Sequence, residues 1–122
     1  MLAPAYETPR KEGLAVLTIE LIYARDCPNL DTARERLRTA LAAVGLPCTW
    51  HEWQSDALEA PKHARGYGSP TILVGGRDVA AQEYGDSGPC CRLYAADGEL
   101  QAAPSVETIR AALHEAARWN VV

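Results

Sequence analysis

The segment YARDCPNLDT, residues 23–32, lies where a strand-like pattern changes into a helical one. Before it, apolar residues alternate from Leu17 to Tyr23, which predicts a strand. Ile22 falls between two of these positions, which indicates that part of the strand is covered on both faces. After it, apolar residues recur at helical spacing: Leu30, Ala33, Leu37, Leu41 and Val44. We therefore predict a strand that leads directly into a helix, with Cys27 at the junction.

Proline and glycine mark the two ends of that helix. Pro28 suits the first helical position, where the missing N–H of proline costs nothing. GLP, residues 45–47, is typical of a C-cap glycine followed by a proline. The pattern therefore predicts a helix that begins at Pro28 and stops at Gly45.

The middle of the chain predicts a second strand and a hairpin. CTWHEWQ, residues 48–54, is rich in β-favouring side chains and predicts a strand. Residues 55–68 contain one proline and two glycines, which limits them to a short helix plus a loop. TILV and RDVA, residues 71–74 and 77–80, flank a Gly-Gly turn and predict a hairpin.

The last part of the chain predicts a loop, a short strand and a helix. Residues 81–90 are polar and contain glycine, so they form the loop, and CRLY, residues 91–94, predicts a short strand or an ordered edge. The last helix begins near Val106, with Ser105 as its N-cap. The predicted fold class is α/β, with a mixed sheet of about four strands flanked by two main helices and one short helix.

Length and charge limit the class of protein. A chain of 122 residues fits one domain that can bury a core. Twelve basic and sixteen acidic residues give a net charge of -4, so no basic field attracts nucleic acid. Residues 1–13 contain two prolines and four charges without a continuous apolar run. We therefore expect a flexible tail rather than a signal peptide, followed by the domain over residues 14–122.

The cysteines indicate a reducing compartment. Without a signal peptide we expect a cytoplasmic protein, and the apolar run at residues 14–23 is too short to cross a membrane. Four cysteines are few for a secreted domain held by disulfides, so the thiols are expected to stay reduced. Their positions raise the question of reactive or metal-binding thiols: Cys27, Cys48, Cys90 and Cys91.

Cys27 is the strongest candidate for a reactive thiol. At or just before a helix N-terminus, unpaired N–H groups and the helix dipole favour thiolate over thiol. The alternative is that Cys27 is a small buried apolar residue. If residues 91–94 are extended, successive side chains point to opposite faces, so at most one of Cys90 and Cys91 faces Cys27. The alternative there is two buried cysteines without chemistry, and we interpret Cys48 as structural.

Two segments resemble thioredoxin-like proteins. CPNL, residues 27–30, is similar to the reactive-cysteine segment of that family, and GSPTI, residues 68–72, resembles the segment in which a cis-proline precedes a strand. The resemblance implies a thioredoxin-like fold, a cis bond before Pro70 and thiol–disulfide chemistry at Cys27, with small-molecule or protein thiols as partners and no required cofactor. Because Leu30 replaces the second cysteine of the C-x-x-C pair, any partner thiol has to come from elsewhere in the chain, and we expect it to be Cys90 or Cys91.

A local resemblance to organomercurial lyases points to a different chemistry. The sequence from Cys90 to Ile109 is similar to the C-terminal cysteine segment of those enzymes, and CPNLDT is similar to their other active-site segment. The resemblance implies Cys27 and Cys90 as thiolate ligands of mercury and Asp31 as the acid. Cysteine and aspartate are four residues apart here rather than three, and either spacing keeps both on one helix face. Two thiolates suit a soft metal ion such as Hg(II).

Three hypotheses follow for the function. The first is a thioredoxin-like protein that carries out thiol–disulfide redox chemistry, and the second is a soft-metal-binding or organomercurial-lyase-like protein. The third is a non-catalytic thioredoxin-like binding module, which Leu30 at the position of a resolving cysteine favours. The first two both assign the chemistry to Cys27.

Overall fold

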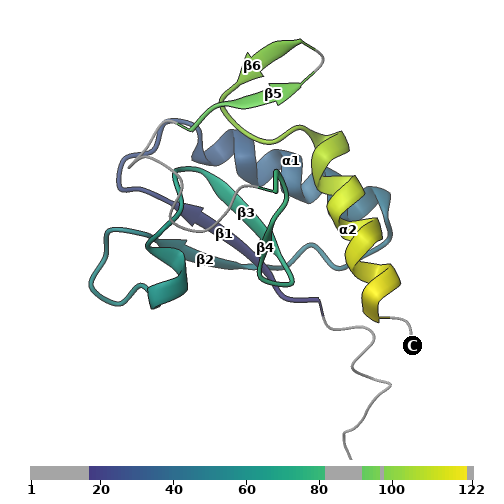
Figure 1. Ribbon diagram of the computed structural model, residues 1–122, viewed down its shortest axis with the longest axis horizontal. Coiled ribbons are helices and arrows are strands. Elements are labelled where there is room, and N and C mark those ends of the chain that lie inside the picture. Colours follow the sequence, from purple (N-terminus) through teal and green to yellow (C-terminus); the bar gives the residue numbers. More distant parts are fainter. Residues whose placement is uncertain (1–16, 82–91, 97, 121–122) are drawn as a thin grey trace, which may run out of the picture.

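A computed structural model describes residues 17–81, 92–96 and 98–120 of the chain, and it has a mixed α/β architecture (Figure 1). A four-stranded sheet has the strand order β2-β1-β3-β4, in which β1 is parallel to β2 and antiparallel to β3. The elements are β1 (Ile19–Tyr23), α1 (Leu30–Ala43), β2 (His51–Gln54), η2 (Lys62–Ala64), β3 (Thr71–Val74), β4 (Arg77–Asp78), β5 (Tyr94–Ala96), β6 (Glu99–Gln101) and α2 (Val106–Asn120). The predicted α/β class, with a sheet of four strands and two main helices, is confirmed.

Strand β1 is buried on both faces of the sheet. Ile19 and Leu21 contact one core that includes buried residues of both α1 and α2. Ile22 faces the other side, where it packs against Ala64 and Tyr67 from the segment between β2 and β3. Burial of each large aliphatic side chain stabilises the folded state by about 1.5–3 kcal/mol. Strand β1 is therefore a main contributor to the stability of the sheet. The alternation predicted for residues 17–23 is therefore confirmed, including cover on both faces.

Helix α1 begins two residues later than predicted. Its N-cap is Asn29, and Pro28 lies in the preceding turn, so the prediction of Pro28 at the first helical position is wrong. The C-terminal prediction is confirmed, because Gly45 has a positive φ of 78°. The N–H of Leu46 donates to the carbonyl of Leu41 at 2.9 Å, and the N–H of Gly45 donates to Ala42 at 3.2 Å, which is a Schellman motif.

The β3–β4 hairpin is confirmed with a shorter second strand. Gly75 and Gly76 both have positive φ, 61° and 83°, as a type I′ turn requires. Strand β4 ends at Asp78 rather than at residue 80, because the carboxylate of Asp78 accepts a hydrogen bond from the N–H of Ala80 at 3.0 Å. That local bond turns the chain away from the ladder.

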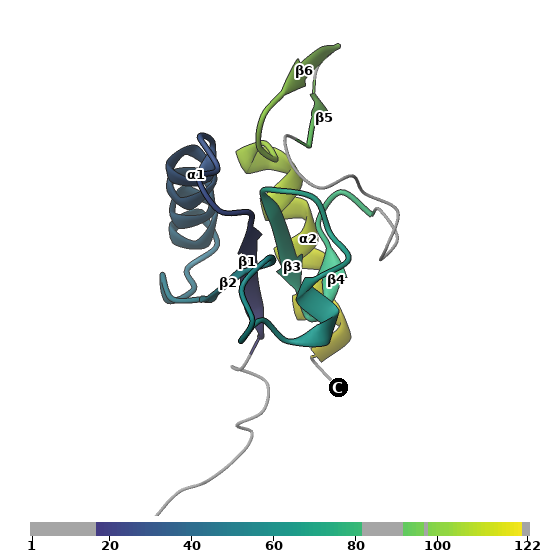
Figure 2. The same ribbon diagram turned by 90° about the vertical axis from the view of Figure 1, so that its left-hand side faces the viewer.

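Strands β5 and β6 form a separate hairpin, and β6 was not predicted. The first strand begins at Tyr94, so residues 92 and 93 of the predicted CRLY strand precede it. Figures 1 and 2 show this hairpin standing away from the four-stranded sheet, at the top of both views. The base of the hairpin is hydrogen-bonded to α1. Arg36 donates to Gln101 at 2.8 Å and to the carbonyl of Ala103 at 3.0 Å.

The remaining elements agree with the sequence in kind and differ in length. The N-cap predicted for α2 is confirmed, because Ser105 Oγ accepts a hydrogen bond from the N–H of Thr108 at 3.1 Å. Strand β2 begins at His51 rather than Cys48, and the short helix predicted within residues 55–68 is the 3-10 turn η2. In the part of the chain that the structure describes, no helix combines the length and the apolar character needed to cross a membrane.

Candidate functional site

Cys27 lies in the connection between β1 and α1, after a tight turn. Its N–H donates to the carbonyl of Ala24 at 3.1 Å, and its side chain is partly exposed. Because the helix cap is Asn29, Cys27 precedes the first turn of α1 rather than forming part of it. The field of a helix dipole falls off within one turn. The dipole of α1 therefore stabilises a thiolate at Cys27 less than the sequence predicted, and neighbouring side chains matter more.

Asp26, immediately before Cys27, has a left-handed backbone with a φ of 61°. This conformation costs an L-amino acid roughly 1–2 kcal/mol, whereas glycine adopts it freely. We expect Asp26→Gly to raise the free energy of unfolding by about 1 kcal/mol after the entropy of glycine in the unfolded chain is subtracted. Urea denaturation measures the change. The control is Arg25→Gly in the same turn, which should lower the free energy; an equal effect of both substitutions would contradict the prediction.

The predicted cis-proline is confirmed and lies against the Cys27 turn. The bond between Ser69 and Pro70 is cis. Ser69 Oγ accepts a hydrogen bond from the N–H of Ala24 at 2.8 Å, at the start of the turn that carries Cys27. The carbonyl of Ser69 accepts the N–H of Arg92 at 2.9 Å. The segment before β3 is therefore bound both to the Cys27 turn and to the chain that enters β5.

A buried network surrounds Pro70 and includes three residues that sequence analysis did not single out. The hydroxyl of Tyr94 donates to the carbonyl of Pro70, and the guanidinium of Arg92 lies 4.4 Å from the centre of the Tyr94 ring. Arg92 Nη1 donates to Thr71 Oγ1 at 2.9 Å, and Nη2 lies 2.6 Å from Asp78 Oδ2. This last contact is an ion pair rather than a well-directed hydrogen bond. Both side chains are buried, with 7% of Arg92 and none of Asp78 exposed.

The environment of Tyr94 favours its neutral form. Burial raises the pKa of Tyr94 to about 12, and the positive charge of Arg92 opposes this increase. Hydrogen bonds connect this phenol to the Cys27 turn, because the Tyr94 hydroxyl binds the carbonyl of Pro70 and the hydroxyl of the preceding Ser69 binds the N–H of Ala24.

Asp31 lies on the exposed surface of α1. Its side chain is 95% exposed and lies 3.2 Å from Arg34. Arg34 also donates to Glu52 of β2 at 2.7 Å, and this hydrogen bond lowers the pKa of Glu52. The Cys27 turn has other partners, because Ser69 Oγ accepts the N–H of Ala24 and Asp56 Oδ1 accepts the N–H of Arg25.

Of the other three cysteines, the structure describes only Cys48. Cys90 and Cys91 lie outside the described residues, and Arg92 is the first described residue after them. Cys48 is exposed, with its sulfur 3.7 Å from the carbonyl of Arg38. Within residues 17–81, 92–96 and 98–120, no group of three or more His, Cys, Asp or Glu side chains is arranged to hold a metal ion.

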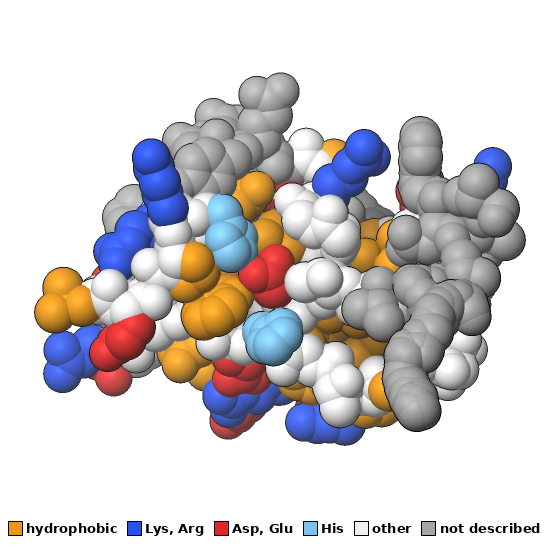
Figure 3. Space-filling view, turned by 90° about the horizontal axis from the view of Figure 1, so that it is seen from below, with side chains coloured by type: hydrophobic (Ala, Val, Ile, Leu, Met, Phe, Trp, Pro, Cys, Tyr) orange, Lys and Arg blue, Asp and Glu red, His pale blue; other side chains and the backbone are white. Residues whose placement is uncertain are grey.

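A second polar cluster occupies the sheet face opposite the helices. Glu20 of β1 has a side chain only 8% exposed, and its Oε2 accepts hydrogen bonds from Trp53 Nε1 at 2.8 Å and lies 2.6 Å from His63 Nε2. Figure 3 shows histidine and acidic side chains close together among hydrophobic ones, on the face seen from below in Figure 1. The sequence signal for this cluster is Glu20 itself, a carboxylate in the middle of a strand that is covered on both faces. Trp53 and His63 provide the hydrogen-bond partners that this buried carboxylate needs.

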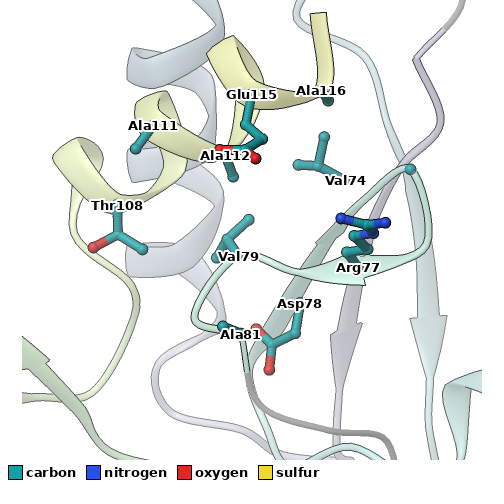
Figure 4. Close-up of a pocket in the computed structure, with 11 residues that line it drawn as sticks. Val74, Arg77, Asp78, Val79, Ala81, Thr108, Ala111, Ala112, Glu115 and Ala116 are labelled. Carbon is teal, nitrogen blue, oxygen red and sulfur yellow. The ribbon is translucent and has the colours of Figure 1, made fainter. Parts of the chain in front are cut away.

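A cavity of about 650 Å³ lies between the β3–β4 hairpin and α2. In Figure 4, Val79 of the hairpin and Ala112 of α2 point toward one another across it, while Asp78 points away from α2. The described lining residues include no thiol and no imidazole. A cavity of this size can hold a small molecule, and Cys27 is not among the residues that line it.

Comparison with known proteins gives no further assignment. No protein-family model, no curated protein and no solved structure matches the chain. A function is therefore inferred from the geometry around Cys27.

Proposed function

We propose that the chain is a thioredoxin-like thiol protein that carries out thiol–disulfide exchange through Cys27, with Cys90 or Cys91 as the second thiol. The observation that carries the proposal is the convergence on Ser69. Its hydroxyl binds the turn that contains Cys27, and its carbonyl binds Arg92, the residue that follows Cys91. Residues more than forty positions apart in the sequence thus meet at one serine.

The topology supports the thioredoxin-like assignment. A parallel β1-α1-β2 unit is followed by the antiparallel β3–β4 hairpin, and a cis-proline stands directly before β3. Leu30, which replaces the second cysteine of a C-x-x-C pair, packs against the main core. Its side chain therefore has a structural role, and the resolving thiol comes from a different part of the chain.

The proposed reaction takes two exchange steps. The thiolate of Cys27 attacks one sulfur of a small-molecule or protein disulfide, and a mixed disulfide forms while one partner thiolate leaves and takes up a proton. The thiolate of Cys90 or Cys91 then attacks the Cys27 sulfur and releases the second partner thiolate. The partner disulfide is reduced by two electrons, the protein dithiol is oxidised, and an external thiol reductant returns the protein to its starting state.

The geometry favours this chemistry over organomercurial cleavage. A lyase needs an acid beside the metal-bound carbon, and the carboxylate of Asp31 is exposed to water and paired with Arg34. In the redox reaction Asp31 has no required role, so Asp31→Ala should leave disulfide formation unchanged.

The test is the oxidation of the reduced full chain by oxidised glutathione, followed by peptide mass spectrometry. We expect a crosslink from Cys27 to Cys90 or Cys91, with a mass loss of two hydrogens. Cys27→Ser should abolish this crosslink, and Cys48→Ser, the control, should not change it. A wild-type Cys27 that stays reduced, or a binding partner held equally well by Cys27→Ser, would contradict the proposal and favour a non-catalytic binding module.

A further inference from the structure

We propose that Asp78, Arg92 and Tyr94 form a positioning network that fixes Pro70 and Thr71 relative to the Cys27 sulfur and thereby sets the rate at which Cys27 exchanges with disulfides. The inference rests on the proposed function, and it assigns a role to three residues outside the thiols themselves. None of the three is a catalytic residue, because each acts through the Pro70 segment.

Arg92 joins three strands through one side chain. Its guanidinium pairs with Asp78 of β4, donates to Thr71 of β3 and stacks on Tyr94 of β5. The hydroxyl of Thr71 in turn donates to the carbonyl of Gly68 at 2.6 Å, so the acceptor of Arg92 is itself held in place. A guanidinium is planar and offers several donors in a fixed fork, which makes it suited to hold several groups in one geometry.

The network binds three consecutive residues at the cis bond. The carbonyl of Ser69 accepts the N–H of Arg92, the carbonyl of Pro70 accepts the Tyr94 hydroxyl, and the hydroxyl of Thr71 accepts the Arg92 guanidinium. The same segment is bound to the Cys27 turn through the Ser69 hydroxyl. The position of Pro70 relative to Cys27 is therefore defined from both sides.

A buried ion pair is a costly way to obtain stability, because the desolvation of two charges offsets most of their attraction. Apolar side chains of similar volume would fill the same space at no such cost. They would not bind Thr71 or orient the Tyr94 ring. The main consequence of the Asp78–Arg92 pair is therefore the fixed geometry of the Pro70 segment, which is hydrogen-bonded to the Cys27 turn.

The test compares two reactions of Cys27 in the full chain. Peptide mass spectrometry follows its mixed disulfide with oxidised glutathione and, separately, its alkylation by iodoacetamide. The variants are Tyr94→Phe, which keeps the ring, and the double variant Asp78→Asn/Arg92→Met, which leaves no unpaired charge. We expect about tenfold slower exchange in both variants, equivalent to about 1.4 kcal/mol in the barrier, with alkylation changed by less than about twofold.

The matched control is Trp53→Phe, which removes a hydrogen bond from the buried Glu20, a carboxylate whose partners Trp53 and His63 are not part of the network, and it should leave both rates unchanged. Exchange at the wild-type rate in both network variants, or an equal slowing in Trp53→Phe, overturns the positioning role while the redox function stands. A wild-type Cys27 that alkylates but does not exchange overturns the redox function, and with it the role of the network in exchange.

Discussion

Arg92→Met is expected to lower the free energy of unfolding by about 3–5 kcal/mol, because it leaves the carboxylate of Asp78 charged and without its partner in the interior. None of the Asp78 side chain is exposed, so water cannot replace the guanidinium. The substitution also removes the donor to Thr71 and the cation that stacks on Tyr94. For a chain of this length the loss is a large part of the total stability. Urea denaturation followed by tryptophan fluorescence measures it.

Two control variants separate the unpaired charge from a general effect of removing arginine. Arg110→Met breaks a partly exposed pair with Glu107 on α2 and should cost less than about 1 kcal/mol. The double variant Asp78→Asn/Arg92→Met should be more stable than Arg92→Met alone, since no buried charge is then unpaired. A cost for Arg92→Met no greater than that of Arg110→Met would show that Asp78 is not a desolvated charge.

The second large effect is a loss of stability in alkaline solution that depends on Tyr94. Burial raises the pKa of Tyr94 from 10.0 to about 12 in the folded state, so the folded protein retains a phenolic proton that the unfolded chain releases. The resulting stabilisation is complete below pH 10 and is lost as the pH rises toward 12. Two pKa units correspond to about 2.7 kcal/mol, and Tyr94 is only 5% exposed, so little of this is screened by water.

Comparison with Tyr94→Phe isolates this contribution from the other groups that titrate in base. Below pH 10 the wild type should be more stable, because its hydroxyl binds the carbonyl of Pro70. Between pH 10 and about 12 the difference should shrink by about 2–3 kcal/mol and can change sign. Urea denaturation at a series of pH values measures both proteins. A difference that stays constant over this range would mean that the phenol is not buried in its neutral form.

Much of the fold was predictable because its signals are local. The apolar alternation of β1, the helical spacing of α1 and α2, and the Gly-Gly turn before β4 each lie within a few residues of the element that they specify. The start of α1 was placed two residues too early because Pro28 suits a turn as well as a first helical turn. Strand β6 was missed because it has only three residues, too few for a pattern to be recognised, and pairs only with β5.

The candidate site was predictable in part. Cys27 stands at a strand-to-helix junction that any reader of the pattern can locate, and the family resemblance pointed to the cis bond before Pro70. The partners of Pro70 carried no such signal, because the buried ion pair joins Asp78 of β4 to Arg92, which precedes β5, and these two segments meet only after folding. The same holds for Glu20, whose donors come from β2 and η2.

The sequence by itself therefore determined the type and order of the main elements and the place of the first thiol. Periodicity, caps and turn residues act over one to four positions along the chain, where no tertiary contact is needed to read them. Only the tertiary structure decided which polar side chains meet, since a buried charge is tolerated only where distant residues supply its partners. That is why the turn of Cys27, the cis-proline and the Asp78–Arg92–Tyr94 network became one site only after the chain had folded.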